Sequence, residues 1–208
     1  MNTVSHNVEL EKLLDGSDSM QREFERIIRI FSVPTELRSQ IPIALASLSM
    51  EHASAMRTLV RQQHYASASA LFRPQFDAVV RAIWFSELAN DSQLAEFKLD
   101  SEKDGVFPKT FEMFDQCEAL DTPIVPILKS YHSTYKNRMH SFTHGGFLAV
   151  KLHATPYEKL STSVYGMIKS SNGLLVLAAM ASAYFLDAPG ALDLVSNAVN
   201  SAREAWAN

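Results

Sequence analysis

The sequence predicts an all-α protein, an up-and-down bundle of helices built as a single domain over residues 1–208. Three observations lead to this fold class. Apolar residues recur at intervals of three and four along nearly the whole chain, which is the period of an amphipathic helix. No segment of the sequence shows the apolar–polar alternation of a half-buried strand. The breaks between periodic segments are short, which favours antiparallel neighbours in a helical bundle.

The periodic segments place the helices in order along the chain. They are expected near residues 8–31, 35–64, 65–89, 93–99, 109–120, 124–142, 155–186 and 191–206.

Start and stop signals justify the first three helices. A break in the first helix at Gly16-Ser17-Asp18 is left open. Thr35 followed by Glu36 is typical of a helix start, and Pro42 is tolerated only near that start. The third helix is expected to end at Asn90-Asp91-Ser92.

Proline and glycine mark the remaining boundaries. Asp104-Gly105 indicates a loop, and Pro126 suits the first turn of the helix at 124–142. Thr155-Pro156 opens the longest late helix, and Ala188-Pro189-Gly190 separates it from the last one.

Composition limits the class of protein. Of the 208 residues, 47% are hydrophobic and 20% charged, so one domain with a sizeable core is expected. The net charge is −4, so nucleic acid would have to bind a local basic patch or a cleft between two copies. The single cysteine, Cys117, allows no intrachain disulfide and suits a reducing cytoplasm.

The sequence predicts neither an export signal nor a membrane-spanning segment. The first 14 residues are polar and acidic, unlike a signal peptide. The strongest apolar run, residues 173–186, is shorter than the about 20 residues that span a bilayer and is interpreted as a buried helix. A cytoplasmic protein with no membrane contact is therefore expected.

The third helix carries a charged stripe. Arg73, Asp77, Arg81 and Trp84 fall within about 80° of one another on a helix, and the other sides are apolar. Such a helix is expected at the centre of its bundle, with Trp84 largely buried. Two interpretations stay open: an internal Arg–Asp–Arg ladder, or an arginine without an acid that lines a cleft and binds an anion.

Residues 138–146 carry the strongest chemical signal. Arg138 can hold a phosphate through its planar fork, and His140 and His144 can move protons near neutral pH. These are the groups that cleave an RNA phosphodiester without a metal. The alternative is a helix that stops at Gly145-Gly146 and carries surface histidines.

Spacing restricts how these groups can act. His132, Lys136, His140 and His144 follow at intervals of four and would share one side of a helix. A zinc site at His140 and His144 needs a third ligand, which Glu51-His52 on another helix could supply. The prediction is nevertheless that the protein holds no metal and no cofactor. Arg138 and His144 lie about 120° apart on an ideal helix. They converge only if the helix ends near residues 141–143 or if a second subunit contributes.

The Arg-x5-His spacing followed by Gly resembles the motif of the HEPN superfamily (higher eukaryotes and prokaryotes nucleotide-binding), an Arg and a His at a helix end. Asp77-x3-Arg81 resembles an acid–base pair that some members carry on an earlier helix. Residues 70–77 with Trp84, and the later Ser-Phe-Thr-His-Gly-Gly, are also similar to bacterial helical families of unknown function grouped with HEPN.

The resemblance implies a HEPN-like bundle and a function. Many HEPN proteins are metal-independent endoribonucleases that dimerise, and they recur in toxin–antitoxin and phage-defence systems. On that pattern Arg138 would hold the scissile phosphate and His144 would transfer protons, while Arg73, Asp77, Arg81 and His140 would support the phosphate site. RNA, a second copy of the chain and an antitoxin or defence partner would be the partners.

Two alternatives remain beside the ribonuclease. One is a non-catalytic helical module that binds a nucleotide or a protein through the same polar residues. The other is a metal-dependent helical enzyme that uses His140 and His144.

Overall fold

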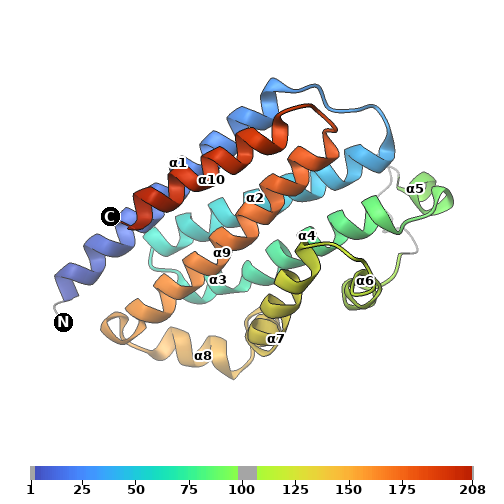
Figure 1. The fold of residues 1–208 in the computed structure, drawn as a ribbon. Coiled ribbons are helices and arrows are strands. Elements are labelled where there is room, and N and C mark those ends of the chain that lie inside the picture. Colours follow the sequence, from blue (N-terminus) through green and yellow to red (C-terminus); the bar gives the residue numbers. More distant parts are fainter. Residues whose placement is uncertain (1–2, 98–106, 208) are drawn as a thin grey trace.

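The computed structural model describes residues 3–97 and 107–207, and within these ranges the chain forms helices and no strands (Figure 1). The model is 82% helical, which confirms the predicted all-α bundle. The helices are α1 Thr3–Ile30, α2 Leu37–Arg61, α3 Tyr65–Ala70, α4 Phe72–Glu87, α5 Asp91–Glu96, α6 Thr110–Cys117, α7 Ile124–Thr143, α8 Phe147–Ala154, α9 Tyr157–Phe185 and α10 Ala191–Ala207.

The long helices lie side by side in layers. α1 packs on α9 and α10, and α2 lies between α9 and α4 with extensive contact to both (Figure 1). α4 in turn contacts α6 and α7, so it has packed neighbours on several sides. This confirms the prediction that the charged helix is central in the bundle.

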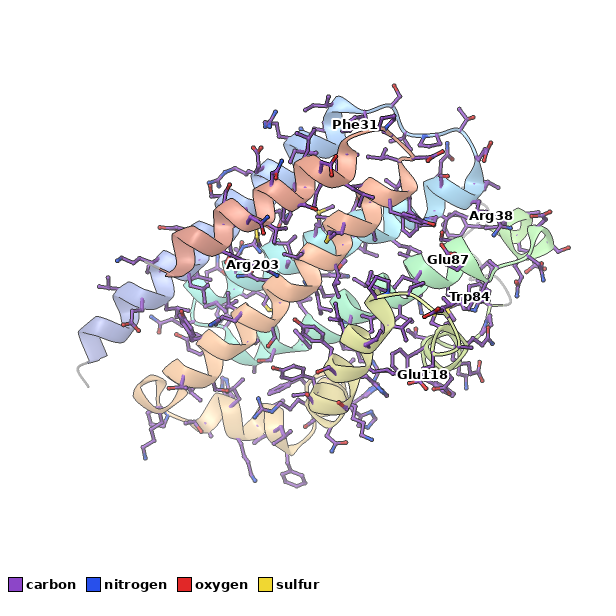
Figure 2. The ribbon with its side chains drawn as sticks, in the orientation of Figure 1. Phe31, Arg38, Trp84, Glu87, Glu118 and Arg203 are labelled. Atoms are coloured by element: carbon purple, nitrogen blue, oxygen red, sulfur yellow. The ribbon has the colours of Figure 1, made fainter. Side chains whose placement is uncertain are left out.

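Trp84 shows how α4 is held. Its side chain is only 2% exposed, as predicted, and Figure 2 places it where α4 meets α6. The indole Nε1 donates a hydrogen bond of 2.6 Å to Oε1 of Gln116 on α6, which satisfies its one polar atom.

The helix predicted at 65–89 is broken into α3 and α4 at Leu71. Pro74 explains the break, because it has no N–H for the carbonyl of Ala70 and its ring would clash with that carbonyl in a continuous helix. The N–H of Leu71 instead closes a tight turn on the Ala68 carbonyl at 3.2 Å. Pro74 then sits in the first turn of α4, where a missing N–H is harmless.

The polar segment Gly16-Ser17-Asp18, by contrast, does not interrupt α1. Ser17 is buried and accepts a hydrogen bond from Nδ2 of Asn172 on α9 at 2.7 Å. Asp18 accepts one from Nε of the buried Arg57 on α2 at 2.5 Å. These polar residues therefore join α1 to its neighbours within the bundle.

α8 occupies a stretch in which no helix was predicted. It is apolar on nearly every side, so it lacks the amphipathic period by which the other helices were recognised. None of its residues is buried, and Phe147 and Val150 are 84% and 58% exposed. An apolar helix normally lies inside a protein, so its exposure here is unusual.

α9 forms the long inner wall of the bundle. Its segment Thr162–Phe185 is long and apolar enough to cross a membrane, but 56% of that segment is buried in the bundle, as the core helix of a soluble protein would also be. Gly173 lies against α7, and a methyl group at this position would overlap the hydroxyl of Tyr131. The absence of a side chain here thus leaves room for the Tyr131 hydroxyl, which reaches from α7 to α9.

Candidate functional site

Helix α7 has two sides that face different surroundings. Residues four apart lie on the same side of a helix, so His132, Lys136 and His140 share one side, while Tyr135, Arg138 and Phe142 belong to the other. The first side faces α4, where His132 and Lys136 line a cavity of about 50 Å³. The second faces α8 and α9, where Tyr135, Arg138 and Phe142 line a cavity of about 560 Å³.

The end of α7 fixes the position of the two predicted histidines. The helix ends at Thr143, and Gly145 follows in the left-handed conformation with φ of +63°. The N–H of Gly146 donates to the carbonyl of Ser141 at 2.6 Å, as in a Schellman motif. This confirms the predicted stop at the glycine pair.

His140 and His144 come together at this stop. The N–H of His144 donates to the carbonyl of His140 at 3.1 Å, and the two ring centroids are 4.7 Å apart. Both side chains are exposed. Two imidazoles are therefore held next to each other at the solvent-facing end of α7.

The side of α7 toward α4 is called the α4–α7 face, and it comprises Arg73, Asp77, Arg81, Thr110, His132, Lys136, His140 and His144. The ring of His132 packs between aromatic side chains, with centroids 6.1 Å from Phe76 and 4.6 Å from Phe114. Nε of Arg73 lies 3.4 Å from Oδ2 of Asp77 in an ion pair.

The charges on the α4–α7 face are only partly matched. Burial raises the pKa of Asp77, and the nearby Arg73 offsets part of that rise by favouring the carboxylate. Nε of Arg81 donates to the hydroxyl of Thr110 at 3.1 Å, and no described carboxylate lies within ion-pair distance of Arg81 or Lys136. In the stripe of α4, Arg73 is therefore ion-paired with Asp77, while Arg81 acts on Asp77 only from beyond ion-pair distance.

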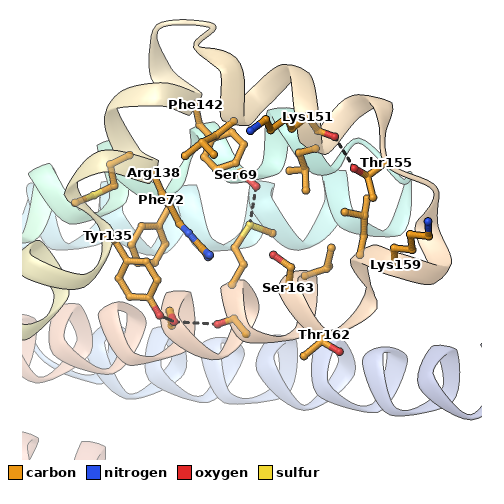
Figure 3. Close-up of a pocket in the computed structure, with 18 residues that line it drawn as sticks. Ser69, Phe72, Tyr135, Arg138, Phe142, Lys151, Thr155, Lys159, Thr162 and Ser163 are labelled. Carbon is orange, nitrogen blue, oxygen red and sulfur yellow. Dashed lines mark hydrogen bonds between the residues drawn. The ribbon is translucent and has the colours of Figure 1, made fainter. Parts of the chain in front are cut away.

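The cavity of about 560 Å³ on the other side is called the α7–α9 cavity (Figure 3). Arg138 of α7, Lys151 of α8 and Lys159 of α9 contribute its cations. No acidic residue lines it in the part of the chain that the structure describes. The remaining lining residues are apolar, aromatic or hydroxyl-bearing, or glycine: Ser69, Phe72, Tyr135, Met139, Phe142, Leu148, Leu152, Thr155, Leu160, Thr162, Ser163, Val164, Gly166, Met167 and Ser170.

The predicted site residues are therefore divided between the two sides of α7. Arg73 and Asp77 line the small cavity, and Arg81, His140 and His144 extend the same face. Arg138 lines the large cavity instead, so the Arg138–His144 pair does not share a cavity within one chain.

Sequence reasoning missed Lys151 and Lys159. They lie on either side of the Thr155-Pro156 connection, and only the packing of α8 against α3 and α7 brings them to the cavity of Arg138. Within residues 3–97 and 107–207, no three His, Cys, Asp or Glu side chains are grouped so as to hold a metal ion, so the third ligand required beside His140 and His144 is not found there.

Comparison with known proteins gives one match. A family described as a family of unknown function (DUF6988) matches residues 46–204, well over half of the chain. Neither a curated protein nor a solved structure matches the sequence. The matched segment includes α4, α7, α8 and α9, and with them both sides of α7. The chain therefore belongs to the DUF6988 family of unknown function.

Proposed function

We propose that the α4–α7 face acts on RNA and that the chain is a metal-independent endoribonuclease of HEPN-like type. The observation that carries the proposal is the contact between the exposed imidazoles of His140 and His144, 4.7 Å apart, at the end of a face that has more cations than carboxylates. Histidine is the side chain best suited to take up and release protons near neutral pH.

Two imidazoles supply both proton transfers of RNA cleavage. One takes the proton of the ribose 2′-hydroxyl while that oxygen attacks the adjacent phosphorus. The other donates a proton to the departing 5′-oxygen, so the products are a 2′,3′-cyclic phosphate and a 5′-hydroxyl. Arg73, Lys136 and Arg81 would bind phosphates along the same face, and Asp77 would orient Arg73 through their ion pair.

Arg138 enters this mechanism only through a second copy of the chain, because it lies on the other side of α7 in its own chain. A homodimer with its two-fold axis beside Gly145 would bring two histidine pairs together and could set Arg138 of one copy near His144 of the other. The exposed Phe147 and Val150, directly after the glycine pair, support an interface at this place.

A non-catalytic module that binds RNA or a nucleotide at the same face is the second candidate. The separation of Arg138 from His144 favours it, because a chain that acts alone would lack that arginine at the scissile phosphate. As a toxin the ribonuclease would be matched by an antitoxin, and in phage defence it would act with a defence partner protein.

The test is cleavage of a mixed set of end-labelled RNAs in the presence of EDTA. We expect cleavage with cyclic-phosphate ends and no cleavage of matched DNA, which lacks the attacking hydroxyl. His144→Ala and His140→Ala should each lower the rate by at least about 10²-fold, the lower end of acid–base contributions. His153→Ala, which removes an exposed histidine of α8, is the matched control and should cleave as wild type.

Intact RNAs, or equal rates for all three variants, would contradict the ribonuclease. RNA binding that weakens with salt and with Lys136→Gln, without cleavage, would then support the binding module.

A further inference from the structure

We infer that the α7–α9 cavity binds a small organic anion, a phosphate or carboxylate group carried on an apolar body. The site is separate from the RNA face proposed above, because it opens on the opposite side of α7. The inference stands whether or not the chain cleaves RNA.

The size of the cavity suits a small molecule. Ligand sites in proteins usually have volumes of about 300–1,000 Å³, and this cavity has about 560 Å³. The cavity on the α4 side, at about 50 Å³, holds little more than a few water molecules.

The charge of the cavity specifies the head group. Arg138, Lys151 and Lys159 come from three different helices, and none of them makes an ion pair with a described side chain. Figure 3 shows the guanidinium of Arg138 reaching into the space between α7 and α9. All three side chains are exposed at the edge of the cavity, so an anion bound there would be attracted by positive charge that no described acid neutralises, and its head group would accept charge-assisted hydrogen bonds from the nearest of them.

The walls specify the body of the ligand. Phe72, Met139, Leu160 and Val164 are buried side chains that line the cavity. Phe72 packs edge-on against Tyr135 with centroids 5.1 Å apart, which gives one wall an aromatic surface. Of the other apolar side chains that line it, Leu148 is 38% exposed and Phe142 and Leu152 are half-buried. A purely inorganic anion would leave these three in contact with water, whereas an apolar body would cover them.

Polar contacts hold the walls in place before a ligand arrives. The hydroxyls of Tyr135 and Ser170 are hydrogen-bonded at 2.7 Å, which joins α7 to α9 (Figure 3). Ser69 Oγ lies 3.0 Å from Sδ of Met167, which joins α3 to α9. The α8 wall is tied by the N–H of Leu148, which donates to Oγ of Ser141 at 3.1 Å. A cavity that is already formed loses little affinity to ordering on binding.

The experiment uses two fluorescent probes of similar shape, anilinonaphthalene sulfonate and its uncharged analogue N-phenylnaphthylamine. We expect the sulfonate to bind the full chain with one site and at least about tenfold more tightly than the neutral probe. Arg138→Gln and Lys151→Gln should each weaken the sulfonate by about tenfold, the effect of losing one charge-assisted hydrogen bond. Lys136→Gln, on the opposite side of α7, is the matched control and should bind as wild type.

Competition then separates the kinds of body. Displacement of the sulfonate by adenosine monophosphate indicates a nucleotide-type ligand, and displacement by laurate indicates an acyl chain. Equal binding of the two probes, equal loss in Lys136→Gln and Lys151→Gln, or displacement by adenosine or dodecanol as strong as by the anions would each overturn the inference. None of these outcomes depends on RNA cleavage.

Discussion

The two sides of α7 differ in how their cations are neutralised. On the α4–α7 face, Arg73 is paired with Asp77 and Arg81 donates to Thr110, and the aromatic packing around His132 leaves a cavity of only about 50 Å³. In the α7–α9 cavity, three cations from three helices line about 560 Å³ without a described acid. One face therefore has the form of a surface for an extended polyanion, and the other has the form of a pocket for a single anionic molecule.

If both proposals hold, one polar helix serves two sites at once. Arg138, His140 and His144 are close in sequence and look like one motif, yet the turn of the helix sends Arg138 to one side and the histidines to the other. Residue types within a short motif therefore identify chemistry more reliably than they identify a common site.

The largest expected effect is on the rate of RNA cleavage, and it tests whether Arg138 and the two histidines act separately. If the two sides act independently, Arg138→Gln should cleave RNA within a few-fold of wild type, while His144→Ala loses at least about 10²-fold. The rates are compared on the same labelled RNAs. If both variants are inactive, co-expression of the two chains decides the matter. A dimer in which Arg138 of one copy serves His144 of the other regains one intact site, and its recovered activity would contradict the division of α7 into two independent sides.

The next effect concerns the contact between Tyr131 of α7 and Gly173 of α9. Gly173→Ala should lower the free energy of unfolding by about 1–3 kcal/mol in urea titrations, because the new methyl overlaps the Tyr131 hydroxyl. Adding Tyr131→Phe should restore part of the loss.

Gly166→Ala is the control for that measurement. It lies in the same helix with open space around its Cβ position, so it should stabilise the protein by about 0.5–1 kcal/mol through helix propensity. Equal effects at Gly166 and Gly173 would show that the contact with Tyr131 does not limit the packing.

A smaller effect reports on burial at the α4–α7 face. Burial raises the pKa of Asp77 above its usual 3.8 in the folded state, so the folded protein holds this proton more tightly than the unfolded chain. As pH rises from below 3.8 through the folded pKa, stability relative to Asp77→Asn should therefore fall. Urea titrations of both proteins across this range measure the difference. A relative stability that increases with pH would mean that Arg73, and not burial, dominates at Asp77.

The smallest effect on stability is expected on α8. Phe147→Ser should change the free energy of unfolding by less than about 0.5 kcal/mol, because the ring is 84% exposed. Light scattering should nevertheless show a lower fraction of dimer, since the ring lies beside the proposed two-fold axis. An unchanged oligomeric state would place the interface elsewhere or remove it.

The fold could be predicted from the sequence wherever one signal dominated. The period of the apolar residues predicted the long helices, and the apolar residues around Trp84 predicted that α4 is central. Gly145-Gly146 predicted the end of α7. The break at Leu71 was missed because the periodicity continues across it, although Pro74 was a local signal that could have revealed it.

The candidate site was less accessible to sequence reasoning. The 120° between Arg138 and His144 predicted that they converge only if the helix ends near residues 141–143 or if a second subunit contributes. The helix ends at Thr143, yet only Arg138 lines the large cavity. The two lysines that line the same cavity as Arg138 could not be predicted. Lys151 and Lys159 are brought there by the position of α8, and α8 lacks the amphipathic pattern by which a helix is recognised in a sequence. Whether the two sides act together depends on tertiary contacts that no local pattern encodes.

Met139 gives the two sides of α7 a common boundary. Its buried side chain lines both the cavity of about 50 Å³ and the cavity of about 560 Å³. Methionine is unbranched and adapts its shape readily. A ligand in the larger cavity that pushes the thioether away from α9 would therefore reduce the volume of the smaller cavity beside α4. Any free energy by which a guest in one cavity changes binding in the other must act with equal size in the reverse direction. Any such coupling across the thickness of α7 would pass through this one thioether, because Met139 lines both cavities.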